Sequence, residues 1–377
     1  MKSEHGPARI PYLDYLRAAV VALVFLHHTA ITYGAAGSWY YAAGATTPLA
    51  KGLLTLFVAY NQSWFMGFLF FLSGYLSLPS YGRKGAGRYV ADRLRRFGIP
   101  LLVYAMVIQP VTVWLAQSAQ PGHLSLVAVY LREHPFGFGV MWFVESLLLM
   151  DLLFVVWAKG LARIDLTARP GGGFPRGRAR AAFAAAIGVA SFLVRLVMPV
   201  GTSFAGLNIC YFPSYIAMFV AGIVAWRMRW LDAIPDGAGR AARRAAVAGL
   251  LLLPTLVVAA RALTHAPTAY FIGGPHWESL CEAVWEQLML VSVSVALLHW
   301  GQRRLNRTSR RWQGWAAASY TAYMIQPVVI VSLSLLFQHV AWSPFGKFAA
   351  VGALSIVIIY AAARALRLMA PVRYLVG

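Results

Sequence analysis

The sequence predicts an all-α fold, a polytopic integral membrane protein of about ten transmembrane helices with its N- and C-termini in the cytoplasm. Apolar residues make up 60% of the 377 residues and charged residues only 12%, and the mean hydropathy is +0.63. A soluble domain carries roughly 25% charged residues, and its apolar runs rarely reach the roughly 18 residues that cross a bilayer. Composition alone therefore favours a membrane protein.

Ten apolar runs are long enough to form these helices. We place them at about 12–33, 52–79, 97–118, 138–158, 181–200, 209–226, 245–264, 282–300, 315–338 and 347–370. The first run has no small-residue cleavage site and is long enough to span a bilayer. We therefore expect it to remain as a helix and not to be removed as a signal peptide.

The Lys and Arg residues gather on one side of these runs. Of the 33 in the chain, 27 fall in alternate loops and in the two tails, including the predicted loop at 83–96. Four fall on the opposite side, and Arg17 and Arg195 lie inside runs. Cytoplasmic loops of membrane proteins carry such an excess. We therefore expect the basic residues behind the net charge of +21 to set the orientation of the protein in the lipid bilayer, and we expect no nucleic-acid partner.

We expect one membrane domain over residues 1–377, with a weak internal boundary. The loop D-L-T-A-R-P-G-G-G-F-P-R-G-R-A-R at 165–180 is rich in Gly and Arg and is typical of a flexible cytoplasmic linker. Cys210 and Cys281 both lie near the outer ends of their runs. They could form a disulfide or remain two unpaired thiols, and we favour unpaired thiols.

The first run carries the most informative pair of polar residues, Arg17 and His28. Eleven residues at about 100° each make three turns and roughly 20°, so in a helix both side chains share one face, about 16 Å apart. Asp14, three residues before Arg17, joins that face. Polar and charged side chains are costly inside a bilayer, so they mark a partner or a reaction. We interpret Arg17 as a cation near the cytoplasmic surface and His28 as a general base deeper in the membrane.

Each of these residues has a structural alternative. Arg17 could extend to the membrane surface and pair with Asp14, and His28 could be a hydrogen-bonded packing residue. His27 points about 100° away from the shared face, and packing is the interpretation that we favour for it.

Four stretches, in order along the chain, resemble the membrane acyltransferase 3 family. They are the Arg-x10-His pattern from Arg17 to His28, F-F-L-S-G-Y-L at 70–76, R-L-R-R-F-G-I-P at 93–100 and W-F-V-E at 142–145. Within that family the chain looks most like the branch that succinylates periplasmic glucans. This likeness rests on the L-D-x-x-R opening, the R-x-G-I-P turn and Y-F-P-S-Y-I-A-M-F-V-A-G-I at 211–223. One departure is Gln326, in S-Y-T-A-Y-M-I-Q-P, where such proteins often have His.

The resemblance implies an acyl-CoA-dependent O-acyltransferase in the bacterial cytoplasmic (inner) membrane. Such an enzyme moves an acetyl or succinyl group from cytoplasmic acyl-CoA to a hydroxyl of an envelope or periplasmic glycan, and it needs no metal. On this interpretation, acyl-CoA is bound by Asp14, Arg17, Ser73, Arg93 and Arg96. The catalytic residues are His28 and Glu145, and the residues that bind the acyl group or the acceptor are Trp142, Arg195 and Gln326.

Structural interpretations of the donor-site residues stay open beside these roles. Arg93, Arg95 and Arg96 lie just before a run, where basic residues commonly orient a helix. The alternative is that they bind the CoA phosphates, because a guanidinium offers a planar donor fork to phosphate oxygens. Ser73 and Gly74 could form a small-residue helix contact, or a backbone opening beside the thioester.

The intramembrane carboxylates also have two interpretations each. Glu145 lies in an apolar run, so we expect it to orient a histidine or to meet a cation, and pairing with Arg195 is its main structural alternative. Arg195 could otherwise contact an anionic acyl group or the sugar. Glu282 and Glu286, one turn apart, could bind a sugar or a cation, or lie solvated at a helix end.

Two other classes of function remain open on sequence alone. A secondary transporter of a small anionic or sugar-like solute would also place charges inside a bundle interrupted by Gly and Pro. It predicts coupling-ion carboxylates in broken helices and an internal repeat, and we find no repeat. A membrane module that binds a lipid or glycan without catalysis is the third class. Thermal stabilisation by acyl-CoA, but not by free sugar, separates the enzyme from both.

Overall fold

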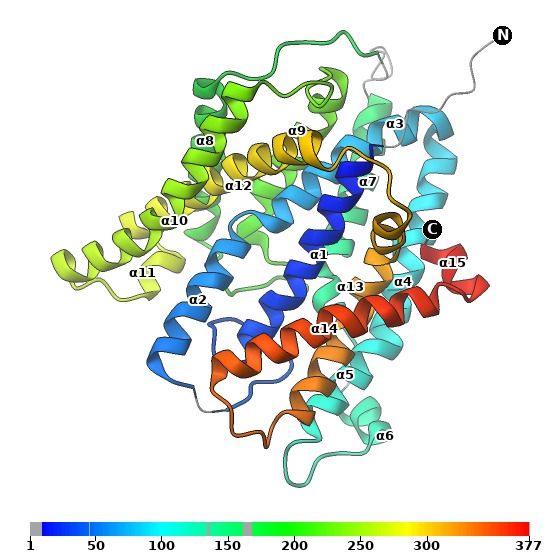
Figure 1. Ribbon diagram of the computed structural model, residues 1–377, viewed down its shortest axis with the longest axis vertical. Helices are drawn as coiled ribbons and strands as arrows, with labels where there is room; N and C mark the ends of the chain where they lie inside the picture. Colours follow the sequence, from blue (N-terminus) through cyan, green and yellow to red (C-terminus); the bar gives the residue numbers. More distant parts are fainter. Residues whose placement is uncertain (1–9, 45, 134–135, 161–167, 377) are drawn as a thin grey trace.

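A computed structural model describes residues 10–44, 46–133, 136–160 and 168–376. Over these residues the fold is all-helical (Figure 1), and the single β-type pairing described is an isolated bridge between Phe204 and Leu207. The predicted fold class is thereby confirmed.

The helical elements follow one another with short connections. In chain order they are α1 (Pro11–Thr32), α2 (Pro48–Gln62), α3 (Phe65–Arg93), η1 (Leu94–Gly98), α4 (Ile99–Val103), η2 (Tyr104–Ile108), α5 (Gln109–Gln117), α6 (Leu126–Ala128), η3 (Val129–Glu133), η4 (Gly139–Met141), α7 (Trp142–Gly160), α8 (Gly177–Arg195), η5 (Ile209–Tyr211), α9 (Phe212–Arg227), α10 (Asp236–Thr264), α11 (Ala269–Ile272), α12 (Trp277–Arg304), α13 (Arg310–Leu336), α14 (Pro344–Leu366) and α15 (Ala370–Val376).

Nine helical runs among the described residues are long and apolar enough to cross a membrane. Eight of them correspond to predicted spans. The ninth, Pro48–Gln117, is 70 residues long and contains the two predicted spans at 52–79 and 97–118. A straight helix of that length would measure about 105 Å, more than three times a bilayer core.

The long run is in fact a hairpin. Figure 1 shows α2 and α3 running up in one direction and α4 and α5 running back down. The kink lies at Gly85, whose φ of 71° and ψ of 167° depart from helical values. Such a positive φ is strained for residues with a Cβ and favours glycine. The predicted loop at 83–96 is therefore helical on both sides of a kink at one glycine.

Helices α3 and α9 pack at the centre of the bundle with their backbones in close contact. An added Cβ on Gly74 would lie 2.0 Å from the Phe219 carbonyl oxygen, and one on Gly222 would lie 2.2 Å from the Phe71 carbonyl oxygen. Only glycine permits this approach, because any side chain would force the helices apart. The interpretation of Gly74 as a small-residue contact is thus confirmed.

The basic segments gather at one end of the bundle, which we call the basic end and define by residues 11–17, 83–96, 227–244 and 303–311. The Tyr15 hydroxyl donates to the Arg307 carbonyl oxygen at 3.2 Å. The Gln302 side-chain amide donates to the Leu231 carbonyl oxygen at 2.8 Å. These bonds tie the starts and ends of α1, α9, α12 and α13 together, as expected for one membrane face.

The weak boundary at 165–180 falls partly outside the described residues. Of the remainder, Arg169 donates to the Trp226 carbonyl oxygen at 3.1 Å, and α8 begins at Gly177. The largest buried hydrophobic cluster draws residues from both sides of this boundary, including Phe25 and Phe219. Both cysteines, Cys210 and Cys281, are free thiols.

Candidate active site

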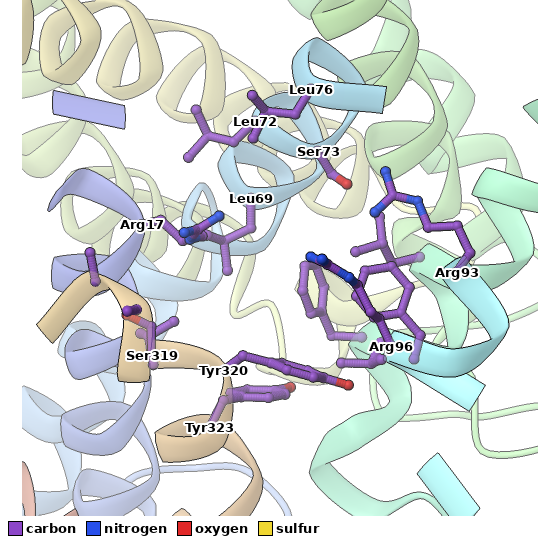
Figure 2. A pocket seen from close by; sticks show the side chains of 17 residues that line it. Arg17, Leu69, Leu72, Ser73, Leu76, Arg93, Arg96, Ser319, Tyr320 and Tyr323 are labelled. Atoms are coloured by element: carbon purple, nitrogen blue, oxygen red, sulfur yellow. The ribbon is translucent and has the colours of Figure 1, made fainter. Parts of the chain in front are cut away.

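A cavity of about 500 Å³ opens between α1, α3, η1, α7 and α13. Leucines of α3 form one apolar wall, and aromatic residues of η1 and α13 form the opposite one. Three arginines line it, and none of its described lining residues is acidic. Figure 2 labels the ten that matter most here: Arg17, Leu69, Leu72, Ser73, Leu76, Arg93, Arg96, Ser319, Tyr320 and Tyr323.

Two of the arginines face each other across this cavity. Figure 2 shows the Arg17 and Arg96 guanidinium groups pointing toward one another from opposite sides. Each pairs with a carboxylate three or four residues earlier in the chain, Arg17 with Asp14 at 2.9 Å and Arg96 with Asp92 at 3.1 Å. Their side chains are 39% and 40% exposed. Because each guanidinium has five N–H donors, a single carboxylate contact leaves donors for an anion between them.

The third arginine, Arg93, is held by residues that do not line the cavity. Its Nε lies 3.0 Å from Oδ2 of Asp151, and its side chain is only 12% exposed. Its Nη2 donates to the Ser77 hydroxyl at 3.3 Å, and its guanidinium lies 4.7 Å from the centre of the Tyr89 ring. Arg93 therefore reaches the cavity wall from a fixed position.

Ser73 and Gly74 turn to different sides of α3. Ser73 lines the cavity, and in Figure 2 its hydroxyl points toward the side of Arg93. Gly74 faces α9. Consecutive residues of a helix point about 100° apart, so Ser73 can line the cavity while Gly74 makes the helix contact.

His28 meets Gln326 and Trp39. Its Nδ1 lies 3.0 Å from Oε1 of Gln326, and its ring stacks on Trp39 with centroids 4.0 Å apart and planes at 14°. With this orientation of the amide, Oε1 can only accept, so Nδ1 carries the proton and Nε2 keeps its lone pair. A histidine in this tautomer can accept a proton at Nε2.

The His28–Gln326 pair lies outside the cavity, further along α1 and α13 than the residues of these helices that line it. On α1, Arg17 and Val21 line the cavity, and His28 follows Val21 by seven residues, which is two turns on the same face. On α13, Tyr323 lines the cavity and Gln326 follows it by three residues. The pair therefore lies about one to two turns past the last lining residues of both helices.

His27 has a different environment. It is 6% exposed, and its ring packs on Phe65 with centroids 5.0 Å apart. The Nδ1 atom of His27 is buried without a hydrogen-bond partner among the described residues. This is the packing position that helical phase predicts for it.

Hydrogen bonds of Tyr40 hold the loop between α1 and α2 against η2 and α5. The Tyr40 and Tyr104 hydroxyl groups are 2.8 Å apart, and Tyr40 also bonds to Gln109. Burial raises the pKa of Tyr40 to about 12, so its hydroxyl stays protonated at neutral pH. An added Cβ on Gly139 would lie 2.1 Å from the Tyr40 hydroxyl. This network fixes the loop that carries Trp39 onto His28.

The other predicted site residues lie away from the cavity lining. Glu145 has its Oε2 atom buried without a hydrogen-bond partner among the described residues. The Trp142 ring stacks on Tyr215, with centroids 5.8 Å apart. Neither residue lines the cavity, although their neighbours Phe143 and Val144 do.

Arg195 is fully buried and pairs with Glu286, not with Glu145. The second carboxylate of this helix face, Glu282, has its Oε2 atom buried without a hydrogen-bond partner among the described residues. A contact between Arg195 and a substrate would require the ion pair to open.

The sequence interpretation did not single out Asp151, the carboxylate that pairs with the cavity-lining Arg93. It is 0% exposed and lies six residues after Glu145, in the middle of α7. An ionisable residue in an apolar run is the signal that marks functional positions in membranes. That signal was present at Asp151, but only the structure pairs it with an arginine of another helix.

A sequence-family model described as an acyltransferase domain matches residues 10–364. A search of curated proteins gave no match, and neither did a search of solved structures. The matched residues make up almost the whole chain and include every helix from α1 to α13. This chain therefore belongs to the acyltransferase 3 family of membrane-bound acyltransferases.

Proposed function

We propose that the protein transfers an acyl group from acyl-CoA, bound at the basic end, to a hydroxyl of an envelope or periplasmic glycan. The observation that carries the donor half is the pair of guanidinium groups of Arg17 and Arg96, which face each other across the cavity. Two like charges in this arrangement repel unless an anion lies between them. The phosphates of CoA supply that anion, and they match the donor fork of arginine.

The apolar wall of the cavity suits the rest of the donor. Leu69, Leu72 and Leu76 line it, and the cavity extends from the arginines toward Tyr323. An acyl-pantetheine arm would run along this wall. Its thioester would approach His28, which lies about 16 Å from Arg17 along α1. This approach requires a movement that opens a passage from the cavity past Tyr323 to His28.

His28 is the group that we propose to activate the acceptor. Its Nε2 takes the proton of the acceptor hydroxyl while that oxygen forms a bond to the thioester carbonyl carbon. The C–S bond then breaks, and the CoA sulfur leaves and takes up the proton. Transfer through an acyl-imidazole on Nε2 is the second route. Asp14 and Ser73 support the donor site, and Gln326 holds the His28 tautomer.

The remaining predicted residues are also given roles in this proposal. Glu145 is proposed to orient the reacting groups from α7, and Trp142 to stack on the acceptor. Arg195 is proposed to contact an anionic acyl group or the sugar after release from Glu286. An acetyl and a succinyl donor both fit this proposal, and the resemblance to the glucan-succinylating branch favours succinyl. The proposed location is the bacterial cytoplasmic membrane, with the basic end inside.

Two experiments test this function. Detergent-solubilised protein should be stabilised against heat by acyl-CoA and not by free sugar, because only a ligand of the folded state raises the melting temperature. Mass spectrometry of envelope glycans should show an acyl ester in cells with the wild-type protein and none in cells with a His28→Ala variant. Stabilisation by sugar alone, with glycans unchanged, would instead support a transporter or a non-catalytic binding module.

A further inference from the structure

The centre of this inference is Asp151, a carboxylate fully buried in the middle of α7. Three side chains of α3 surround it. Its Oδ1 accepts from the Tyr89 hydroxyl at 2.5 Å and from the Ser77 hydroxyl at 2.9 Å. Its Oδ2 lies 3.0 Å from Nε of Arg93. A buried carboxylate is costly unless it is paired and hydrogen-bonded. Here Oδ1 accepts two hydrogen bonds, and Oδ2 makes the ion pair with Arg93 but has no hydrogen bond among the described residues.

These partners come from both arms of the helical hairpin. Ser77 precedes the kink at Gly85, and Tyr89 and Arg93 follow it. One carboxylate on α7 therefore holds the two arms together and fixes them to a third helix. The described residues do not pack against the kink, since an added Cβ on Gly85 would meet nothing within 4 Å.

The second arm carries the arginines that line the cavity. Arg93 ends α3, and Arg96 follows it by three residues in the π-helical segment η1. Among the described residues, the ion pair of Arg96 is with Asp92, a residue of the same arm. The position of the whole arm relative to Arg17 on α1 therefore depends on contacts to other helices. In the described part of the chain, the buried ion pair among these contacts is the one between Arg93 and Asp151.

We propose that Asp151 is a positioning residue, which sets the Arg93 guanidinium and the segment carrying Arg96 at the donor cavity. This inference rests on the proposed acyl-CoA site. Asp151 does not line the cavity, so it acts on the donor through Arg93. Its loss would misplace two arginines at once, and a misplaced guanidinium makes a weaker charge-assisted contact to phosphate.

The first test compares Asp151→Asn with a matched control, Asp232→Asn. Asp232 also pairs with arginines at the basic end, but it is 41% exposed and holds Arg169 and Arg229. Asp151→Asn should raise the KM for acyl-CoA about tenfold or more and change kcat less than about threefold. Asp232→Asn should change neither. A lower KM in Asp151→Asn would show that Asp151 merely neutralises the cavity, and would overturn the proposal.

A double-mutant cycle with Arg93→Gln then tests whether Asp151 works through Arg93. In the Arg93→Gln background, Asp151→Asn should change the KM by less than about twofold, because the shared contact is already gone. Effects that multiply would mean that Asp151 acts by another route, and the proposal would fail. The paired variant also removes both buried charges together, which spares the fold an unpaired ion.

A third variant covers the case in which Asp151→Asn does not fold. Tyr89→Phe keeps both charges and removes one hydroxyl donor, and it should raise the KM about two- to threefold. An unchanged KM in folded Tyr89→Phe protein would overturn the proposal in that case. Acyl-CoA binding that Arg17→Ala weakens but Asp151→Asn leaves intact would refute this inference alone. Wild-type protein that does not bind acyl-CoA would refute the proposed function as well.

Discussion

The Nδ1 atom of His28 on α1 lies 3.0 Å from Oε1 of Gln326 on α13, 298 residues later in the chain. The two helices run side by side from the basic end, where the Tyr15 hydroxyl also accepts from the Ser309 backbone N–H at 3.0 Å. With this orientation of the amide, Oε1 can only accept, so Nδ1 is the donor of this contact. In a neutral ring the lone pair then lies on Nε2, which is the atom that we propose takes the proton of the acceptor.

His28→Ala should abolish acyl transfer while acyl-CoA binding persists, because the change removes the proton acceptor and leaves Arg17 and Arg96 in place. His27→Ala is the control: it leaves a void beside Phe65 and lowers the melting temperature, but it should keep much of the activity. Transfer rates and acyl-CoA affinity of purified variants check both expectations. Loss of transfer in His27→Ala and not in His28→Ala would reject the assignment by helical phase.

Gln326→Leu should lower kcat about tenfold or more with little change in the KM for acyl-CoA, since residues that orient a reacting histidine have effects of this size. Leucine has a similar volume and no acceptor for Nδ1. Steady-state kinetics at saturating acceptor measure the split. A changed KM with an unchanged kcat would place Gln326 in substrate binding and not behind His28.

Arg17→Ala should raise the acyl-CoA concentration needed for half-maximal rate, because it removes a charge-assisted contact to phosphate. Arg17→Lys should restore only part of the loss, since an ammonium lacks the planar fork. Arg96→Ala should resemble Arg17→Ala, as the two guanidinium groups face the same space. Isothermal titration with acyl-CoA and with CoA measures the affinities. Unchanged donor binding in folded Arg17→Ala protein would overturn this role.

Gly74→Ala should destabilise the bundle, because the new methyl group would lie 2.0 Å from the Phe219 carbonyl oxygen. Overpacking of this kind costs about 1–3 kcal/mol or more. Gly87→Ala on the same helix meets nothing within 4 Å, so it should leave the melting temperature unchanged or slightly higher. Thermal unfolding in detergent compares the pair. Equal melting temperatures would mean that α3 and α9 do not pack this closely.

The two ends of the bundle should differ in their reaction with a membrane-impermeant thiol reagent in intact cells. In a background with Cys210→Ala and Cys281→Ala, Arg88→Cys should be protected, because Arg88 lies at the basic end. Thr268→Cys at the opposite end should be labelled. Both positions are exposed, so protection reports sidedness. Labelling of Arg88→Cys from outside would reverse the orientation and remove the proposed cytoplasmic donor site.

Features that depend on one helix could be predicted from the sequence. The spans follow from apolar length, and the segregation of Lys and Arg follows from charge counts. The common face of Arg17 and His28, with His27 turned away, follows from 3.6 residues per turn. The structure keeps these relations, since Arg17 lines the cavity and His27 packs on Phe65.

Contacts between helices were decided by the tertiary structure. The sequence offered Glu145 as a partner for Arg195, but Glu286 takes that place, and nothing in the sequence joined Asp151 to Arg93. The predicted loop at 83–96 is helical on both sides of a kink at Gly85. Helical phase gives the direction of a side chain around its own axis. It does not give the rotation and crossing of two helices, which are set by close approaches such as Gly74 on Phe219.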